Sequence, residues 1–315
     1  MKFSRTVANL NTWEPNMRIF LTGSTGFIGS KIVPELIQAG HQVLGLTRSD
    51  SGVRTLAALG ADAHRGDIED LDSLRSGAAR CDGVIHTAFD HNFANFVANC
   101  QKDRRAIEAL GSAFVGSNRP IIITSSTAMG TATAGQPATE DHFDPEHPNP
   151  RVASELAGRE LSGRGLNVSV VRLSQIHNTL KQGLVTDVVA LARKTGIAAY
   201  VGEGLNRRSA THVCDAAHVF KLALEKNQPG ARYHASAEEG IAFRHIAQAI
   251  AQTLGIPAVS MSSAEAAIHF GWLTAFVGKD MSAASTKTRA LLGWEPVEQG
   301  LLADIAAKLP KAMPL

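Results

Sequence analysis

The sequence has few cysteines, only two tyrosines and almost no charge excess, and each shortage excludes a class of protein. Cys81, Cys100 and Cys214 are far apart and form no CxxC pair, so we expect neither a disulfide framework nor a zinc cluster. Lysine and arginine number 31 against 29 aspartates and glutamates, which leaves no basic footprint for nucleic acid or an anionic membrane. No apolar run approaches the ~20 residues of a membrane span. A cytoplasmic protein with a small-molecule partner is therefore expected.

The first 16 residues show no sustained hydrophobic period and lack the apolar core of a signal peptide. An apolar run begins at Met17, so residues 1–16 are interpreted as an N-terminal extension, and Met17 is a second candidate for the start of the chain. The alternative is a strand or helix that packs on the main domain.

Short apolar runs alternate with amphipathic stretches between Met17 and Arg172. They predict strands at 19–21, 43–46, 62–65, 83–86, 121–123 and 168–172, and helices at 26–39, 51–60, 70–80, 92–116 and 151–164. Strands that are apolar throughout and separated by helices indicate a parallel sheet covered on both faces. Right-handed crossovers make this an α/β fold, a doubly wound Rossmann sheet.

Helices dominate beyond Arg172, with a single predicted strand at 231–235. The helices are expected at 180–195, 214–226, 243–254, 263–271 and 300–309. So few strands indicate a smaller, mostly helical C-terminal lobe at the carboxyl edge of the sheet, where such folds place their ligands. The Rossmann domain would comprise 17–175, with 208–228 returning to it, and the substrate lobe 176–207 and 229–315.

A glycine-rich turn, Thr22–Gly29, lies between the first predicted strand and the first helix. Its first glycine permits a sharp turn, its second lets the backbone approach a pyrophosphate, and its third permits close packing of helix on strand. Free N–H groups at the helix start would face the phosphates. The strand before and the helix after the turn favour a dinucleotide site. Its residues would be Gly23, Thr25, Gly26, Phe27, Ile28 and Gly29.

The end of the second strand indicates which dinucleotide is bound. A carboxylate there would hold the ribose hydroxyls of NAD, whereas an arginine accommodates the 2′-phosphate of NADP. Arg48 occupies this position and no acid precedes Asp50. NADP(H) is therefore favoured over NAD(H), and a solvated loop cation is the alternative reading of Arg48.

Together with the glycine turn, several later segments resemble the extended short-chain dehydrogenase/reductase superfamily, which includes NAD(P)-dependent epimerases and dehydratases. The resemblance covers about 17–300 and rests on Gly66–Ile68, His86–Ala88, Thr124–Ser126, Arg172–Asn178 and His212–Asp215. It implies further cofactor contacts by Asp67, Ile68, His86, Thr87, Ala88 and Thr124. For His86, a buried and hydrogen-bonded histidine explains the pattern equally well.

The same resemblance places the catalytic serine at the end of the fifth strand. Ser126 is the first candidate and Ser125 the second, because the end of a central strand faces the cofactor crevice. The alternative is a small residue that satisfies backbone groups at the strand end.

The sequence departs from the superfamily where the proton relay is expected. The family places Tyr-x-x-x-Lys before the sixth strand, and this chain has Arg151 and Glu155 at those two positions. Its tyrosines, Tyr200 and Tyr233, are not followed by lysine at the fourth position. Arg151 is a poor general acid, but its donors suit a carbonyl, carboxylate or phosphate. An i,i+4 ion pair between Arg151 and Glu155 is the alternative.

A substitute acid must titrate nearer neutrality, which directs attention to the histidines. His177 is the first candidate, because the resemblance places its segment beside the nicotinamide. By the same resemblance, Arg207 or Arg208 would grip an anionic substrate, with a solvated turn as the alternative. No histidine spacing typical of a metal site occurs.

These features predict an NADP(H)-dependent oxidoreductase that acts on a small carbonyl or hydroxyl compound through an atypical active site. The alternative is a non-catalytic dinucleotide-binding sensor or scaffold that has lost the tyrosine and lysine. Helix-paired dimers are common in the resembling superfamily, so a homodimer is an expectation as well.

Overall fold

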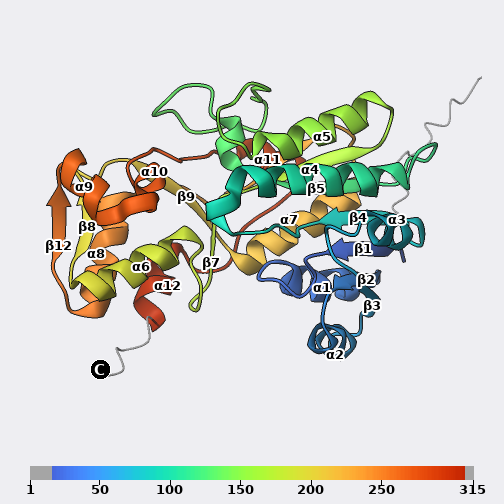
Figure 1. The fold of residues 1–315 in the computed structure, drawn as a ribbon, viewed down its shortest axis with the longest axis horizontal. Coiled ribbons are helices and arrows are strands. Elements are labelled where there is room, and N and C mark those ends of the chain that lie inside the picture. Colours follow the sequence, from blue (N-terminus) through green and yellow to red (C-terminus); the bar gives the residue numbers. More distant parts are fainter. Residues whose placement is uncertain (1–15, 309–315) are drawn as a thin grey trace, which may run out of the picture.

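The computed structural model describes residues 16–308, so the predicted extension lies, except for Asn16, outside the described residues. The larger unit is a seven-stranded parallel sheet in the order β10-β6-β5-β4-β1-β2-β3 (Figure 1). Its strands are β1 (Arg18–Thr22), β2 (Gln42–Thr47), β3 (Asp62–Arg65), β4 (Gly83–His86), β5 (Ile121–Ser126), β6 (Val168–Leu173) and β10 (Arg232–Ala235). The predicted Rossmann α/β fold is confirmed.

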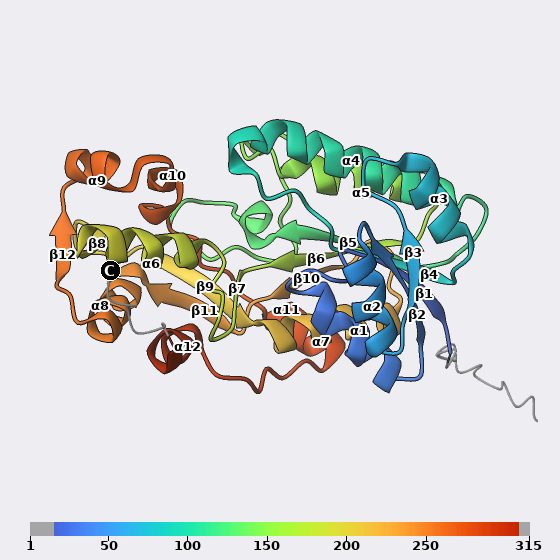
Figure 2. The ribbon, with the colours of Figure 1, turned by 60° about the horizontal axis from the view of Figure 1, so that its bottom comes forward.

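Helices cover both faces of this sheet (Figure 2). One face carries α1 (Gly29–Gln38), α2 (Asp50–Ala58) and α7 (Val213–Lys226), and the other α3 (Leu71–Ala79), α4 (Phe96–Ser112) and α5 (Val152–Gly163). Successive residues of β1 divide between the two layers: Ile19 and Leu21 pack with α1 and α7, whereas Phe20 packs with α3 and α4. Because both faces are buried, the strands are apolar throughout.

The smaller lobe contains helices and five short strands. Its helices are α6 (Leu184–Thr195), α8 (Phe243–Leu254), α9 (Ser263–Phe270), α10 (Thr274–Val277) and α12 (Leu301–Lys308). Its strands are β7 (Gln175–His177), β8 (Ala198–Val201), β9 (Arg207–His212), β11 (Glu238–Ala242) and β12 (Ala258–Met261), in the sheets β11-β9-β7 and β12-β8. All of these helices except the short α10 were predicted. The strands were not, because three to six residues are too short to show a period of two clearly.

The predicted assignment of all residues after 228 to the lobe needs a correction. β10 pairs with β6 in parallel, with Tyr233 opposite Val171, and α11 (Thr286–Leu292) packs on β10 and α7. Trp294, fully buried, belongs to the core on the α1 and α7 face. The chain thus returns to the large sheet once more than predicted. Within residues 16–308, no helix is long and apolar enough to cross a membrane.

A buried ion pair connects three elements of the Rossmann unit. The guanidinium of Arg172 on β6 donates to both carboxylate oxygens of Glu155 on α5, at 2.7 and 2.8 Å. It also donates to the carbonyls of Thr139 and His142, in the loop between β5 and α5. His234 of β10 completes the group, with Nε2 3.3 Å from the Arg172 Nη1. This loop is therefore fixed to the sheet.

His234 is held neutral by its surroundings. Burial and then the charge of Arg172 lower the pKa of His234 from 6.5 to about 4. The neutral ring donates from Nδ1 to the Ala284 carbonyl at 2.8 Å and accepts from Arg172. Below pH 6.5 the unfolded chain binds a proton that the folded ring does not. The stability contributed by His234 is therefore lost as the pH falls from about 6.5 toward 4.

We expect His234 to make the free energy of unfolding decrease by about 1.4 kcal/mol per pH unit below pH 6. Urea unfolding of wild type and His234→Gln at pH 7.5, 6.0 and 5.0 measures this, and the variant should show a shallower decrease. His245→Gln, at an exposed position of α8, is the control and should follow wild type. Equal slopes for wild type and His234→Gln would contradict the prediction.

Candidate active site

A cleft of about 1400 Å³ lies at the carboxyl ends of the parallel strands, between the large sheet and the lobe. Twelve predicted cofactor residues line it: Gly23, Thr25, Gly26, Phe27, Ile28, Gly29, Arg48, Asp67, Ile68, Thr87, Ala88 and Thr124. Ser125, Ser126, Arg151 and Arg208 line it as well. His86, His177 and Arg207 do not. The strand ends meet at one edge, so residues far apart in sequence share this cleft.

The glycine turn has the close packing that a pyrophosphate site requires. Gly23 has a φ of +69°, and a Cβ at Gly29 would lie 2.1 Å from the Gly23 carbonyl oxygen. Helix α1 begins without a side-chain cap, and within the described residues no carbonyl accepts from the N–H groups of Phe27 and Ile28. These N–H groups are available to an anion at the positive end of the helix. The turn therefore fits the phosphates of a dinucleotide.

His86 lies beneath the cleft and does not line it, so its role is structural. Its Nδ1 lies 2.7 Å from the Thr22 hydroxyl, and its Nε2 lies 3.0 Å from Asp103. The Thr22 oxygen accepts from the N–H groups of Thr87 and Ala88, so its hydrogen is left for His86. His86 can then donate to Asp103. The alternative of a buried, hydrogen-bonded histidine is correct.

Asp103, on α4, holds the guanidinium of Arg151 in the cleft floor. Its Oδ2 is 2.6 Å from the Arg151 Nη1 and also accepts from the Ser154 hydroxyl at 2.6 Å. Burial raises the pKa of the Asp103 carboxyl, but the charge of Arg151 and the hydrogen bonds from His86 and Ser154 outweigh it and lower the pKa to about 2. Asp103 is therefore ionised, and a charge pair lies beneath the cleft.

Arg151 keeps donors for a ligand. Its Nη1 donates to Asp103 and Ser154, and one Nη2 hydrogen donates to the Thr124 carbonyl at 3.0 Å. The guanidinium lies 4.1 Å from the ring centre of Phe89. Its Nε hydrogen and second Nη2 hydrogen have no acceptor within residues 16–308. The alternative ion pair with Glu155 is wrong, because Glu155 binds Arg172.

The two serines differ in their hydrogen bonds. The Ser126 oxygen accepts from the Ala128 N–H at 3.3 Å, which leaves its hydrogen for a ligand. The Ser125 hydroxyl is buried and has no partner among the described residues. Both serines line the cleft.

His177 and Arg207 lie outside the cleft, which corrects the roles expected for them. His177 is fully buried, with Nδ1 2.6 Å from Asp304 of α12. Arg207 binds Asp280 at 2.9 Å and donates to the Gly135 carbonyl. Sequence position did not show this, because adjacent residues of a strand point to opposite faces and the partners come from distant segments. Arg208, next along β9, faces the cleft.

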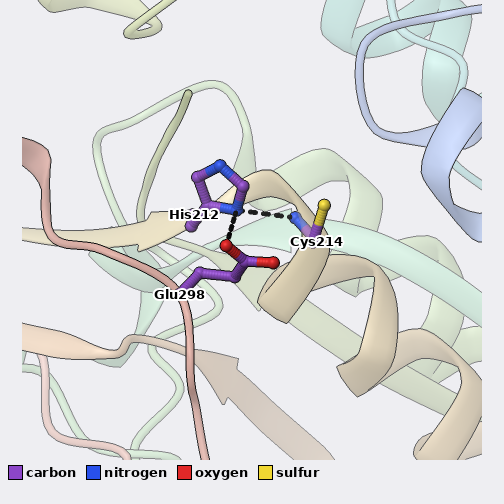
Figure 3. A group of neighbouring side chains, drawn as sticks. All are labelled: His212, Cys214 and Glu298. Atoms are coloured by element: carbon purple, nitrogen blue, oxygen red, sulfur yellow. Dashed lines mark hydrogen bonds and ion pairs between the residues drawn. The ribbon is translucent and has the colours of Figure 1, made fainter. Parts of the chain in front are cut away.

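His212 begins the helix that returns to the Rossmann sheet, in a group with Cys214 and Glu298 (Figure 3). Its Nδ1 accepts from the Cys214 N–H at 3.4 Å and lies 3.8 Å from a Glu298 oxygen. Burial, then the Glu298 charge, raises the pKa of the Cys214 thiol. One ring nitrogen of His212, the Cys214 sulfur and one Glu298 oxygen lie within 4.8 Å of one another. We interpret this group as the cap of α7.

The structure adds cleft residues that the sequence analysis did not select. His91 follows β4, and among the described cleft residues it is the one histidine. Its Nδ1 lies 3.1 Å from the Phe89 carbonyl. Burial, then the charges of Lys181 and Arg151, lower the pKa of His91. Its position just after the segment 86–88, at the carboxyl end of a parallel strand, was the signal that could have identified it.

Comparisons with known proteins identify the family and the fold. The NAD dependent epimerase/dehydratase family matches residues 19–236. An uncharacterized protein of Schizosaccharomyces pombe is 43% identical over 292 residues, which cover 92% of this chain and 99% of the relative. The 4-hydroxy-2-methyl-3-oxo-4-farnesyl-3,4-dihydroquinoline-1-oxide ketoreductase of Stigmatella aurantiaca is 25% identical, over 81% of this chain and 80% of its own length.

Among solved structures, the UDP-glucose 4-epimerase of Thermus thermophilus in complex with NAD has the same fold. Its TM-score is 0.70 at 21% identity, with 92% of this chain and 97% of that chain covered. The match of the family model over more than half of the chain, together with the parallel sheet and its glycine turn, shows that this protein belongs to the NAD-dependent epimerase/dehydratase family.

Proposed function

We propose that the protein is an NADP(H)-dependent oxidoreductase that reduces a carbonyl compound. The observation that carries the proposal is the convergence of Ser126 and the ion-paired Arg151 in the same cleft as the glycine turn. A bound nicotinamide dinucleotide would supply the hydride. The residues of the chain would bind the two ligands, orient the reacting oxygen and provide a proton.

Ser126 and Arg151 would act on the oxygen of the substrate. The Ser126 hydroxyl donates one hydrogen bond, and Arg151 offers its unused Nε and Nη2 hydrogens. Negative charge develops on this oxygen during reduction, and fixed donors stabilise it most when they need no rearrangement. Asp103 supplies that fixation, since it holds Arg151 from below at 2.6 Å. Arg151 is therefore proposed to bind the oxygen and not to donate the proton.

His91 is proposed as the proton donor. Among the described cleft residues, neither tyrosine nor cysteine is present. Of the residue types that remain, carboxylic acids, lysine and arginine have ordinary pKa values far from neutrality, whereas the ordinary value of histidine is near 6.5. The hydrogen bond from Nδ1 to the Phe89 carbonyl leaves Nε2 to carry the transferred proton. Because the pKa of His91 is lowered, the protonated form declines as the pH rises above the acidic range.

The preference for NADP is supported by Arg48. Its side chain is 81% exposed, and its ion pair with Asp67 is long, at 3.5 Å. It can therefore turn to a 2′-phosphate at little cost. The end of β2 offers no carboxylate for the ribose hydroxyls of NAD before Asp50. The ketoreductase from Stigmatella aurantiaca supports carbonyl reduction as the reaction class.

We expect Arg48→Ala to weaken NADPH binding at least tenfold and to leave NADH binding within twofold of wild type. NADPH binding weakens because the 2′-phosphate loses its cationic partner. Fluorescence titration of each cofactor measures both dissociation constants, with Arg54→Ala, on α2 but outside the cleft, as the control. Unchanged NADPH affinity would refute the assignment of Arg48.

Ser126→Ala should lower kcat for carbonyl reduction by about 10²–10³, because one donor to the developing oxyanion is lost. NADPH affinity should stay the same. Ser125→Ala is the matched control, and a larger loss there would make Ser125 the catalytic serine. Tight cofactor binding without turnover of any carbonyl compound would favour the alternative of a sensor or scaffold.

The pKa of His91 lies below 6.5, and the kcat for reduction should fall as the pH rises through it. In His91→Asn, kcat should no longer increase toward acidic pH. Rates at saturating NADPH between pH 5 and 8 measure this. An unaltered pH profile in His91→Asn would assign the proton to solvent or to another group.

A further inference from the structure

Aromatic side chains from both units meet across the cleft. Phe89, His91 and Phe93 belong to the segment between β4 and α4, and Phe96 begins α4. Trp272 and Phe276 belong to the lobe. Phe93 stacks on Trp272, with ring centres 5.5 Å apart and planes 23° from parallel. Phe276 meets both of these rings edge-on, each at 6.1 Å. We call these six side chains the aromatic wall.

The aromatic wall is incompletely covered. Trp272 is 52% exposed, although it lies in a cleft among other rings. Phe93 and Phe96 are partly exposed as well. Apolar surface that gathers in a concave site marks the binding place of an apolar ligand, since covering it removes that surface from water. Flat rings favour a flat partner, because offset stacking adds to the gain from burial.

The wall also stands beside the proposed chemistry. His91 belongs to it and is 5.2 Å, centre to centre, from Phe89, and Arg151 lies over the same Phe89 ring at 4.1 Å. A ligand on the wall would therefore have its polar end near the donors of Arg151. The site therefore offers hydrogen-bond donors at one end and an apolar surface beside them.

Positive charges around the substrate side of the cleft are poorly arranged for a nucleoside diphosphate. Arg207 is bound to Asp280 outside the cleft. Arg208 faces the cleft, but it is buried and donates to the Met281 sulfur and the Phe276 carbonyl. Lys102 is paired with Asp90 and Glu69. Lys181 lines the cleft, but it lies over the Phe27 ring of the glycine turn, 5.4 Å from the ring centre, on the side of the cofactor. Two phosphates need several fixed donors, and in the described lobe Arg207 and Arg208 are already engaged.

We infer that the substrate is a planar, apolar carbonyl compound, held by its flat face on the aromatic wall, and that a nucleotide sugar is not accepted. That the substrate is a carbonyl compound rests on the proposed function. That it binds by a flat, apolar face rests on the aromatic wall alone. Phe93 and Trp272 are the specificity-determining residues, since their stack connects the two units across the cleft.

The test uses 2-naphthaldehyde, butanal and UDP-glucose with wild type, Phe93→Ala, Trp272→Ala and the control Ile268→Ala. Ile268 is an apolar residue of α9 that is 88% exposed and lies outside the cleft. We expect KM for 2-naphthaldehyde to rise at least tenfold in the first two variants, with KM for butanal within twofold. Ile268→Ala should match wild type, and millimolar UDP-glucose should not inhibit.

A second measurement separates this inference from the proposed function. Binding of 2-naphthalenemethanol without cofactor is followed by ligand-observed NMR, which needs no turnover. Binding that is lost in Trp272→Ala supports the aromatic site even when no carbonyl compound is reduced. Reduction of butanal and 2-naphthaldehyde with equal kcat/KM in wild type, unchanged by Phe93→Ala, would overturn the inference and leave the reductase intact. Competition by micromolar UDP-glucose would overturn it as well.

Discussion

The ion pair between Asp103 and Arg151 is the interaction on which the arrangement of the cleft depends. A carboxylate buried this deeply is tolerated only with a close cation and hydrogen bonds, and here Arg151 supplies the cation and His86 and Ser154 supply the bonds. The pair joins α4 to the start of α5 and reaches β1 through Thr22. It places a guanidinium at the end of β5, with two hydrogens that have no acceptor among the described residues.

Glu155 lies one helical turn after Arg151 but faces the other way. It turns to the sheet and binds Arg172 in the interior. The same Arg172 holds the loop before α5 through two carbonyls. Glu155 thus contributes to the packed interior, whereas Arg151 lines the cleft. In the proposed binding mode, the aromatic wall supplies the surface that holds the substrate.

Much of the site followed from sequence because its parts are local. The turn at Gly23–Gly29 needs only a strand, three glycines and a helix, and Arg48 needs only the end of the next strand. Ser126 was found in the same way, at the end of β5. His177 and Arg207 were misplaced, because the side of a short strand on which a residue falls depends on pairing with distant chain. His91 was missed, since the loop after β4 has no pattern that fixes its course.

The sequence by itself determined the parallel sheet, the succession of its first six strands along the chain and the glycine turn, because apolar runs and glycine spacing report local backbone and burial. Only the tertiary structure decided the partners of the buried charges: Arg151 with Asp103, and Glu155 with Arg172. It also decided that β10 joins the large sheet and that Phe93 meets Trp272. Such pairings join segments far apart in the chain. The type of a residue shows that it needs a partner when it is buried, but only the fold determines which residue that partner is.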